Sequence, residues 1–193
     1  IAFSLETLAA SGAPFPVFPG GAAPSVAKDG TLALVRRSEA PSELVWVGRD
    51  GAVEQVADLP GPANDAPEGL AAIALSVDGR RAVVNLLREG YGDLWVCDLA
   101  RDSASRLISK RADALSAVWT PGGEVIFTSL LGGQRWNLWR VTGDGGEPTR
   151  LTSFDGIQNP LAVSSDGRFL AYAQGAGGVA DLFVLPLDGS REG

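Results

Sequence analysis

The chain has 193 residues, of which 45% are apolar and 20% charged, and its formal net charge is −7. These values suit one compact folded unit, and because no basic run occurs, they argue against a nucleic-acid surface or an anionic membrane as partner. Histidine is absent and Cys97 is the single cysteine, which excludes a Ser-His-Asp triad, a histidine metal site and a cysteine cluster built from this chain alone.

The N-terminal residues predict two short strands. Residues 1–5 (IAFSL) share the apolar pattern of residues 95–99 (WVCDL), and residues 15–18 follow as a second apolar run. The chain lacks methionine and begins at Ile1. We therefore expect it to start inside a structural unit of a longer protein. No stretch approaches the roughly 18 apolar residues that span a bilayer, so no membrane insertion is expected.

Four segments then repeat one pattern, in which a turn dipeptide is followed 17 residues later by an aromatic residue within an apolar run. The four pairs are Asp29-Gly30 with Trp46, Asp78-Gly79 with Trp95, Gly122-Gly123 with Trp139, and Asp166-Gly167 with Phe183. Successive aromatics are 49, 44 and 44 residues apart. A fixed internal spacing with variable connections predicts a hairpin unit with adjustable loops.

Each unit reads as four short strands, because runs of aliphatic and aromatic residues are bounded by Gly, Asp and Pro and no helical periodicity persists. In the second unit we expect strands at 70–75, 81–87, 93–99 and 105–108, and in the third at 115–119, 124–129, 137–141 and 148–151. The Asp-Gly pairs suit tight hairpins, where we expect both residues to take positive φ angles.

A period of 40 to 50 residues with four antiparallel strands is typical of a β-propeller blade. The predicted fold is all-β, a propeller of four-stranded antiparallel blades that forms an incomplete arc of a six- to eight-bladed ring. The expected boundaries are 1–19 for the end of a preceding blade, 20–59, 60–109 and 110–152 for three blades, and 153–193 for a blade without its last strand.

Specific motifs carry a family resemblance. Residues 76–80 (SVDGR) followed by 93–99 (DLWVCDL) resemble the WD-repeat-like blade of TolB-type propellers, as do residues 165–172 with 181–184. Residues 3–8, 44–51 and 118–123 look more narrowly like the propellers that follow the kinase domain of bacterial serine/threonine protein kinases. The third unit departs from the pattern, with Pro121-Gly122-Gly123 in place of Asp-Gly.

The candidate binding residues lie in the loops that join second to third strands and in the connections between blades, which share one face of a propeller. They are Arg88, Glu89, Tyr91, Gln134, Arg135, Trp136, Phe154 and Gln158. Aromatic and arginine side chains are enriched in binding hot spots. The alternative is that Tyr91 and Trp136 pack against their own blades.

The resemblance implies a non-catalytic module that binds a protein or a small ligand as a sensor or scaffold, attached to a bacterial serine/threonine kinase. No metal and no cofactor are expected. Two alternatives remain open: the gating propeller of a prolyl-oligopeptidase-like serine hydrolase, and a TolB-like periplasmic protein-binding propeller. The expected partners are further blades, a covalently attached domain and an unidentified ligand, and an extracytoplasmic location is favoured over the cytoplasm.

Overall fold

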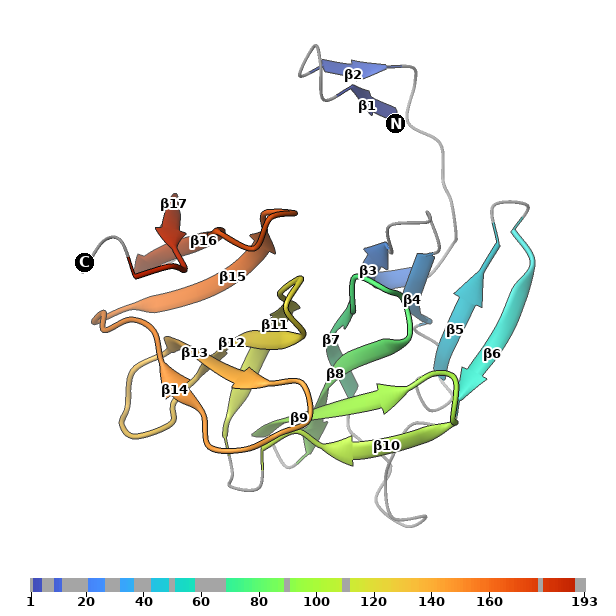
Figure 1. Ribbon diagram of the computed structural model, residues 1–193, viewed down its shortest axis with the longest axis horizontal. Coiled ribbons are helices and arrows are strands. Elements are labelled where there is room, and N and C mark those ends of the chain that lie inside the picture. The colour runs from blue at the N-terminus through green and yellow to red at the C-terminus, as the bar shows by residue number, and fades with distance from the viewer. Residues whose placement is uncertain are drawn as a thin grey trace.

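The computed structural model describes residues 2–4, 9–11, 21–26, 32–36, 43–48, 51–57, 69–88, 91–108, 112–176 and 179–189. Within these ranges the secondary structure consists of strands β1 to β17 (Figure 1). The described part of the chain contains no helix long and apolar enough to cross a membrane.

The strands form five antiparallel sheets, four of which we call blades 1 to 4. A separate pair joins β1 (Ala2–Ser4) to β2 (Ala9–Ser11). Blade 1 has β3 (Gly21–Val26), β4 (Leu32–Arg36), β5 (Glu43–Val47) and β6 (Val53–Ala57). Blade 2 has β7 (Gly69–Leu75), β8 (Arg81–Arg88), β9 (Tyr91–Asp98) and β10 (Ser103–Arg106). Blade 3 has β11 (Ala114–Trp119), β12 (Glu124–Ser129), β13 (Asn137–Thr142) and β14 (Thr149–Arg150). Blade 4 has β15 (Ile157–Val163), β16 (Phe169–Ala176) and β17 (Val179–Pro186).

Within each blade, consecutive strands pair as neighbours, so the sheet order follows the chain order. The predicted all-β fold with four-stranded antiparallel sheets is therefore confirmed, and the strands of blades 2 and 3 lie within about two residues of their expected positions. The N-terminal pair includes a strand that the sequence did not predict, because β1 pairs with Ala9–Ser11. Residues 15–18, expected to form a second N-terminal strand, lie outside the described residues.

In blades 2, 3 and 4, the turn between the first and second strands contains the same glycine hydrogen bond, although the blade 3 turn, from Thr120 to Glu124, is one residue shorter than the turn from Ser76 to Arg81. In blade 2, Gly79 N donates to Ser76 O at 2.9 Å, and the glycine has a φ of 68°. Gly123 and Gly167 repeat this with φ values of 81° and 74°. Asp78 does not share the positive φ angle we expected of it; its Oδ1 instead accepts hydrogen bonds from Ser76 Oγ at 2.6 Å and Arg80 N at 3.1 Å. Asp29 and Gly30 lie outside the described residues.

The blades stand side by side in chain order, with first strand next to first strand (Figure 1). β7 contacts β3 and β11, and β11 contacts β15. Sheets that meet along their first strands and fan outward have the arrangement of a β-propeller.

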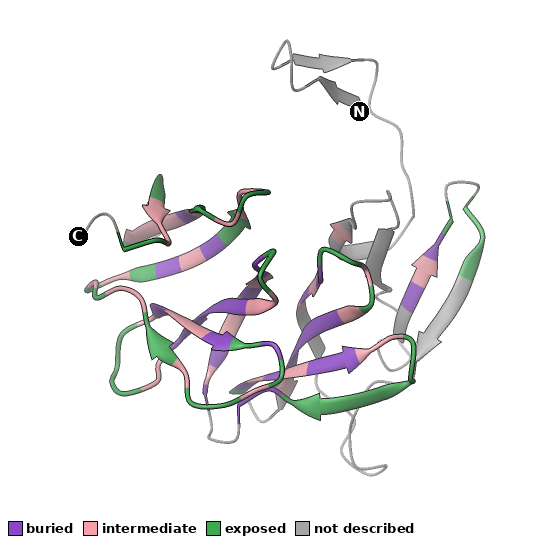
Figure 2. Cartoon of the chain, viewed as in Figure 1, coloured by how far each residue is buried: buried purple, intermediate pink, exposed green. Residues whose placement is uncertain are grey.

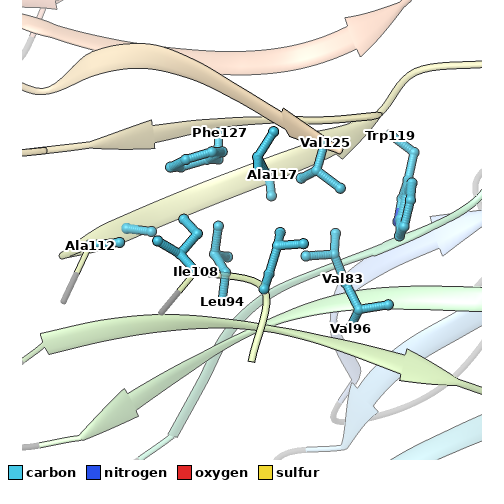
Figure 3. Close-up of a cluster of buried hydrophobic side chains, with 12 residues drawn as sticks. Val83, Leu94, Val96, Ile108, Ala112, Ala117, Trp119, Val125 and Phe127 are labelled. Carbon is cyan, nitrogen blue, oxygen red and sulfur yellow. The ribbon is translucent and has the colours of Figure 1, made fainter. Parts of the chain in front are cut away.

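Apolar side chains fill the spaces between blades. Between blades 2 and 3, Val83, Leu94 and Val96 pack against Ala117 and Phe127, all at most 9% exposed (Figure 3). Burial at about 25 cal/mol per Å² of apolar surface makes such layers the main source of stability. Figure 2 shows that the buried segments concentrate in the inner strands of blades 2 and 3.

Two polar side chains also join neighbouring blades. Asn85 Nδ2 on β8 donates to the carbonyl oxygens of Ala114 and Leu115, at 2.7 and 2.5 Å. The corresponding residue of β12, Thr128, donates from Oγ1 to Gln158 O at 2.6 Å. Each bond fixes the first strand of the next blade against the second strand of the preceding one.

The third-strand aromatics lie where the repeat predicts. Trp46 and Trp95 pack at the edge of the layer between blades 1 and 2, and Trp139 packs against the layer between blades 2 and 3. Phe183, their counterpart in blade 4, stacks on Tyr172 with ring centroids 5.6 Å apart. The indole N–H groups of Trp95 and Trp139 are buried and find no acceptor among the described residues.

Candidate functional site

The loops of this fold divide into two faces. The turns that join first to second and third to fourth strands lie together, as Leu99 N shows by donating to Arg80 O at 2.9 Å. We call this side the turn face. The loops between second and third strands and the connections between blades lie at the opposite strand ends, which we call the rim face.

On the rim face, the loop before β13 and the connection before β15 are tied together. Gln158 N donates to Trp136 O at 3.0 Å, and Phe154 N donates to Asn137 Oδ1 at 2.7 Å. Arg135 Nη1 donates to Asp155 O at 2.9 Å. Loop backbones held in this way present their side chains in a fixed arrangement, which lowers the ordering cost of binding.

Four of the predicted binding residues come together on these two segments: Gln134, Arg135, Trp136 and Phe154. Gln134 is exposed, and the Arg135 side chain is 57% exposed although it also pairs with the Asp155 carboxylate at 3.5 Å. Trp136 and Phe154 are half-buried, with the Phe154 ring lying against Gly156. Both aromatic residues are therefore partly accessible to solvent.

Gln158 differs from the other predicted site residues because its side chain is 2% exposed. Its Oε1 accepts from Thr152 Oγ1 and its Nε2 donates to Gln174 Oε1 at 2.7 Å. The expectation that Gln158 is accessible is therefore wrong. Its side chain instead joins the connection between blades 3 and 4 to β16.

The remaining predicted rim residues belong to blade 2. Tyr91 begins β9 and is 43% exposed, and the backbone of Arg88 pairs with it in the hairpin register. Glu89 lies outside the described residues. Asp155 is the rim residue that sequence reasoning missed, since its contact with Arg135 joins positions 20 residues apart and no local pattern signals it.

The described residues hold neither a metal-ligand cluster nor a reactive thiol. No cluster of three or more carboxylate or cysteine side chains that could hold a metal ion occurs in the described ranges. Burial raises the pKa of the Cys97 thiol to about 11, so at neutral pH it is a protonated, apolar packing group.

Comparison with protein families gives no matching family model. Over 122 residues, 63% of this chain, the sequence is 30% identical to the Tol-Pal system protein TolB of Anaeromyxobacter dehalogenans strain 2CP-C. The match spans about a quarter (26%) of that relative's length.

Solved structures share the fold. TolB from Acinetobacter baumannii superposes with a TM-score of 0.69 at 22% identity, covering 88% of this chain and 41% of that one. A puromycin hydrolase gives a TM-score of 0.66 at 21% identity, covering 89% and 30%. The chain therefore has a TolB-like β-propeller fold. Because non-catalytic and hydrolytic proteins both contain it, the fold alone does not assign an activity.

Proposed function

We propose that this chain is a non-catalytic protein-binding β-propeller module that contributes blades to a larger protein. The observation that carries the proposal is the joined pair of rim loops, which displays Gln134, Arg135, Trp136 and Phe154 from a braced backbone. Arginine and partly exposed aromatic side chains are the groups that anchor protein interfaces. The sequence similarity to TolB favours this reading over a hydrolase.

The test is photo-crosslinking in the organism's own cells. A benzophenone amino acid replaces Gln134 in the full-length protein, and a second version carries it at the exposed Arg150 on β14 as a control. We expect a discrete protein adduct from position 134 only, and a loss of most of that adduct when Arg135→Ala is added. The Arg135→Ala change also removes the bond to Asp155 O, but the bonds donated by Phe154 N and Gln158 N still join the two loops.

Two results would overturn the proposal. One is equal labelling from positions 134 and 150, which indicates non-specific encounter. The other is an adduct at 134 that Arg135→Ala and Trp136→Ala both leave at full yield, because the side chains of the rim would then contribute nothing to recognition.

Attachment to a bacterial serine/threonine kinase remains a prediction, which the coding DNA on both sides of this sequence tests. Kinase motifs upstream would support a sensor or docking propeller. A Gly-x-Ser-x-Gly elbow and a histidine downstream would instead support the gating propeller of a serine hydrolase. A secretion signal with a small upstream domain would support a TolB-like periplasmic protein, in keeping with the extracytoplasmic location we favour.

A further inference from the structure

A charged cleft lies on the turn face, away from the rim loops. Its volume is about 550 Å³, and its charged lining consists of Asp78, Arg80, Arg81, Asp98, Arg101 and Asp144. The turns of blade 2 supply most of these side chains, and Asp144 comes from the turn after β13 in blade 3. The cleft therefore spans the junction between two blades.

Arg81 is the most constrained cation of the cleft. Its guanidinium carbon lies 4.7 Å from the ring centroid of Trp119, and its side chain is 30% exposed. Trp119 is itself 6% exposed and donates from Nε1 to Ala74 O at 3.0 Å. Because the aromatic ring is fixed, contact with it restricts the orientation of the guanidinium before a ligand binds.

The carboxylate that now faces Arg81 is weakly held. Asp144 Oδ1 lies 3.0 Å from Arg81 Nη1, but the Asp144 side chain is 93% exposed. Ion pairs between such exposed groups contribute about 0–1 kcal/mol, so an incoming carboxylate can replace this one at little cost. Asp144 contacts Arg81 through one oxygen only. A ligand carboxylate that bonds to two nitrogens of the guanidinium would form a stronger, bidentate pair.

The charged lining of the cleft consists of three arginines and three aspartates, so it offers a dianion no excess of positive charge. Hydrogen bonds from Ser76 Oγ and Arg80 N lower the pKa of Asp78. Desolvation raises the pKa of Asp98, but the hydrogen bonds from the Arg101 and Ala100 N–H groups and the Arg101 side chain outweigh it and lower the pKa overall. Both carboxylates are ionised at neutral pH and disfavour a dianion such as phosphate more than a monoanion.

We propose that this cleft binds one carboxylate of a partner peptide, with Arg81 as its bidentate anchor, and that Asp144 is the internal carboxylate the ligand displaces. The remaining acidic side chains suit a cationic group next to that carboxylate. This second surface deepens the proposed protein-binding function, but it uses a different face and different residues from the rim.

The probe is a blocked glutamyl-lysine dipeptide, titrated into the protein while the Trp119 indole N–H signal is followed by ¹⁵N–¹H NMR. Its neutral counterpart, blocked glutaminyl-lysine, and inorganic phosphate are titrated in parallel. We expect saturable binding of the glutamyl peptide only. Asp144→Asn should tighten it about two- to fivefold by removing the competitor, and Arg81→Gln should weaken it about tenfold or more.

Arg168→Gln is the matched control, because Arg168 occupies the same turn in blade 4 and its guanidinium lies over Phe169 instead of lining the cleft. The Arg168→Gln variant should bind the glutamyl peptide with the same dissociation constant as the unchanged protein. Since Asp144 is exposed, Asp144→Asn remains informative even if Arg81→Gln destabilises the blade junction.

Unchanged or weaker affinity in Asp144→Asn would overturn the proposal, and so would phosphate binding as tightly as the glutamyl peptide. If Arg168→Gln weakened binding of the glutamyl peptide as much as Arg81→Gln does, the loss of affinity would reflect overall charge, and the proposal would also be overturned. A rim adduct from position 134 that persists alongside any of these results would show that the cleft proposal alone has failed.

Discussion

Single aspartates in the repeated turns make the stability of the fold depend on pH. Hydrogen bonds from Ser76 Oγ and Arg80 N lower the pKa of Asp78 from its usual 3.8, and bonds from Ser164 Oγ and Arg168 N do the same for Asp166. A carboxylate whose pKa is lower in the folded state stabilises that state above its unfolded pKa. This contribution disappears as pH falls through the folded value.

We therefore expect the melting temperature to fall as the pH drops below about 4, partly through Asp78. Asp78→Asn should lower the melting temperature at neutral pH and flatten the acid decline, which thermal denaturation followed by circular dichroism measures. Asp102→Asn is the control, because Asp102 is exposed and its φ of 50° is one that asparagine accepts. An acid slope in Asp78→Asn as steep as in the control would contradict this assignment.

At the scale of elements, close backbone approach between blades requires a glycine at one position. A Cβ on Gly92 of β9 would lie 1.8 Å from Ala114 O, at the start of β11, and 3.0 Å from Asn85 Oδ1. The backbone of β11 cannot move away without breaking the two hydrogen bonds that it accepts from Asn85.

Gly92→Ala should therefore cost about 1–3 kcal/mol of unfolding free energy, as overpacking does. Gly133→Ala is the matched control, since a Cβ there has nothing within 4 Å. Urea denaturation measures both. Equal midpoints for the two variants would show that blades 2 and 3 adjust their separation freely.

The sequence could predict features that depend on local pattern, but not features that depend on contact between blades. The strands of blades 2 and 3 follow from local alternation and turn residues, so the prediction placed Trp95 and Trp139 on the correct strands. The burial of Gln158 and the pairing of Arg135 with Asp155 depend on how one blade meets the next. Packing between sheets also produces the shift in register between Ala114 and Ala117 and the cleft that Arg81 lines. Neither feature has a signal in the local sequence.

At the scale of the whole molecule, the fourth blade presents an apolar face that no described strand covers. Leu182 and Val184 on β17 are 78% and 65% exposed. Their counterparts on β9, Leu94 and Val96, are 1% and 6% exposed because blade 3 covers them. The corresponding positions on β16 are the small residues Ala171 and Ala173, so the face also lacks the polar side chain that Asn85 provides in blade 2.

A contiguous apolar surface beside a strand that pairs on only one side among the described strands favours self-association in water. We expect this chain, prepared alone, to form dimers or larger species as its concentration rises, and Leu182→Lys to shift it toward the monomer in sedimentation velocity. Val77→Lys is the control, because Val77 is 47% exposed but lies in a turn outside that face. A wild-type chain that stays monomeric throughout, or equal dissociation by both lysine variants, would show that the face of blade 4 does not drive association. Lysine opposes association only at the surface that associates, so the difference between the two variants locates that surface on β17.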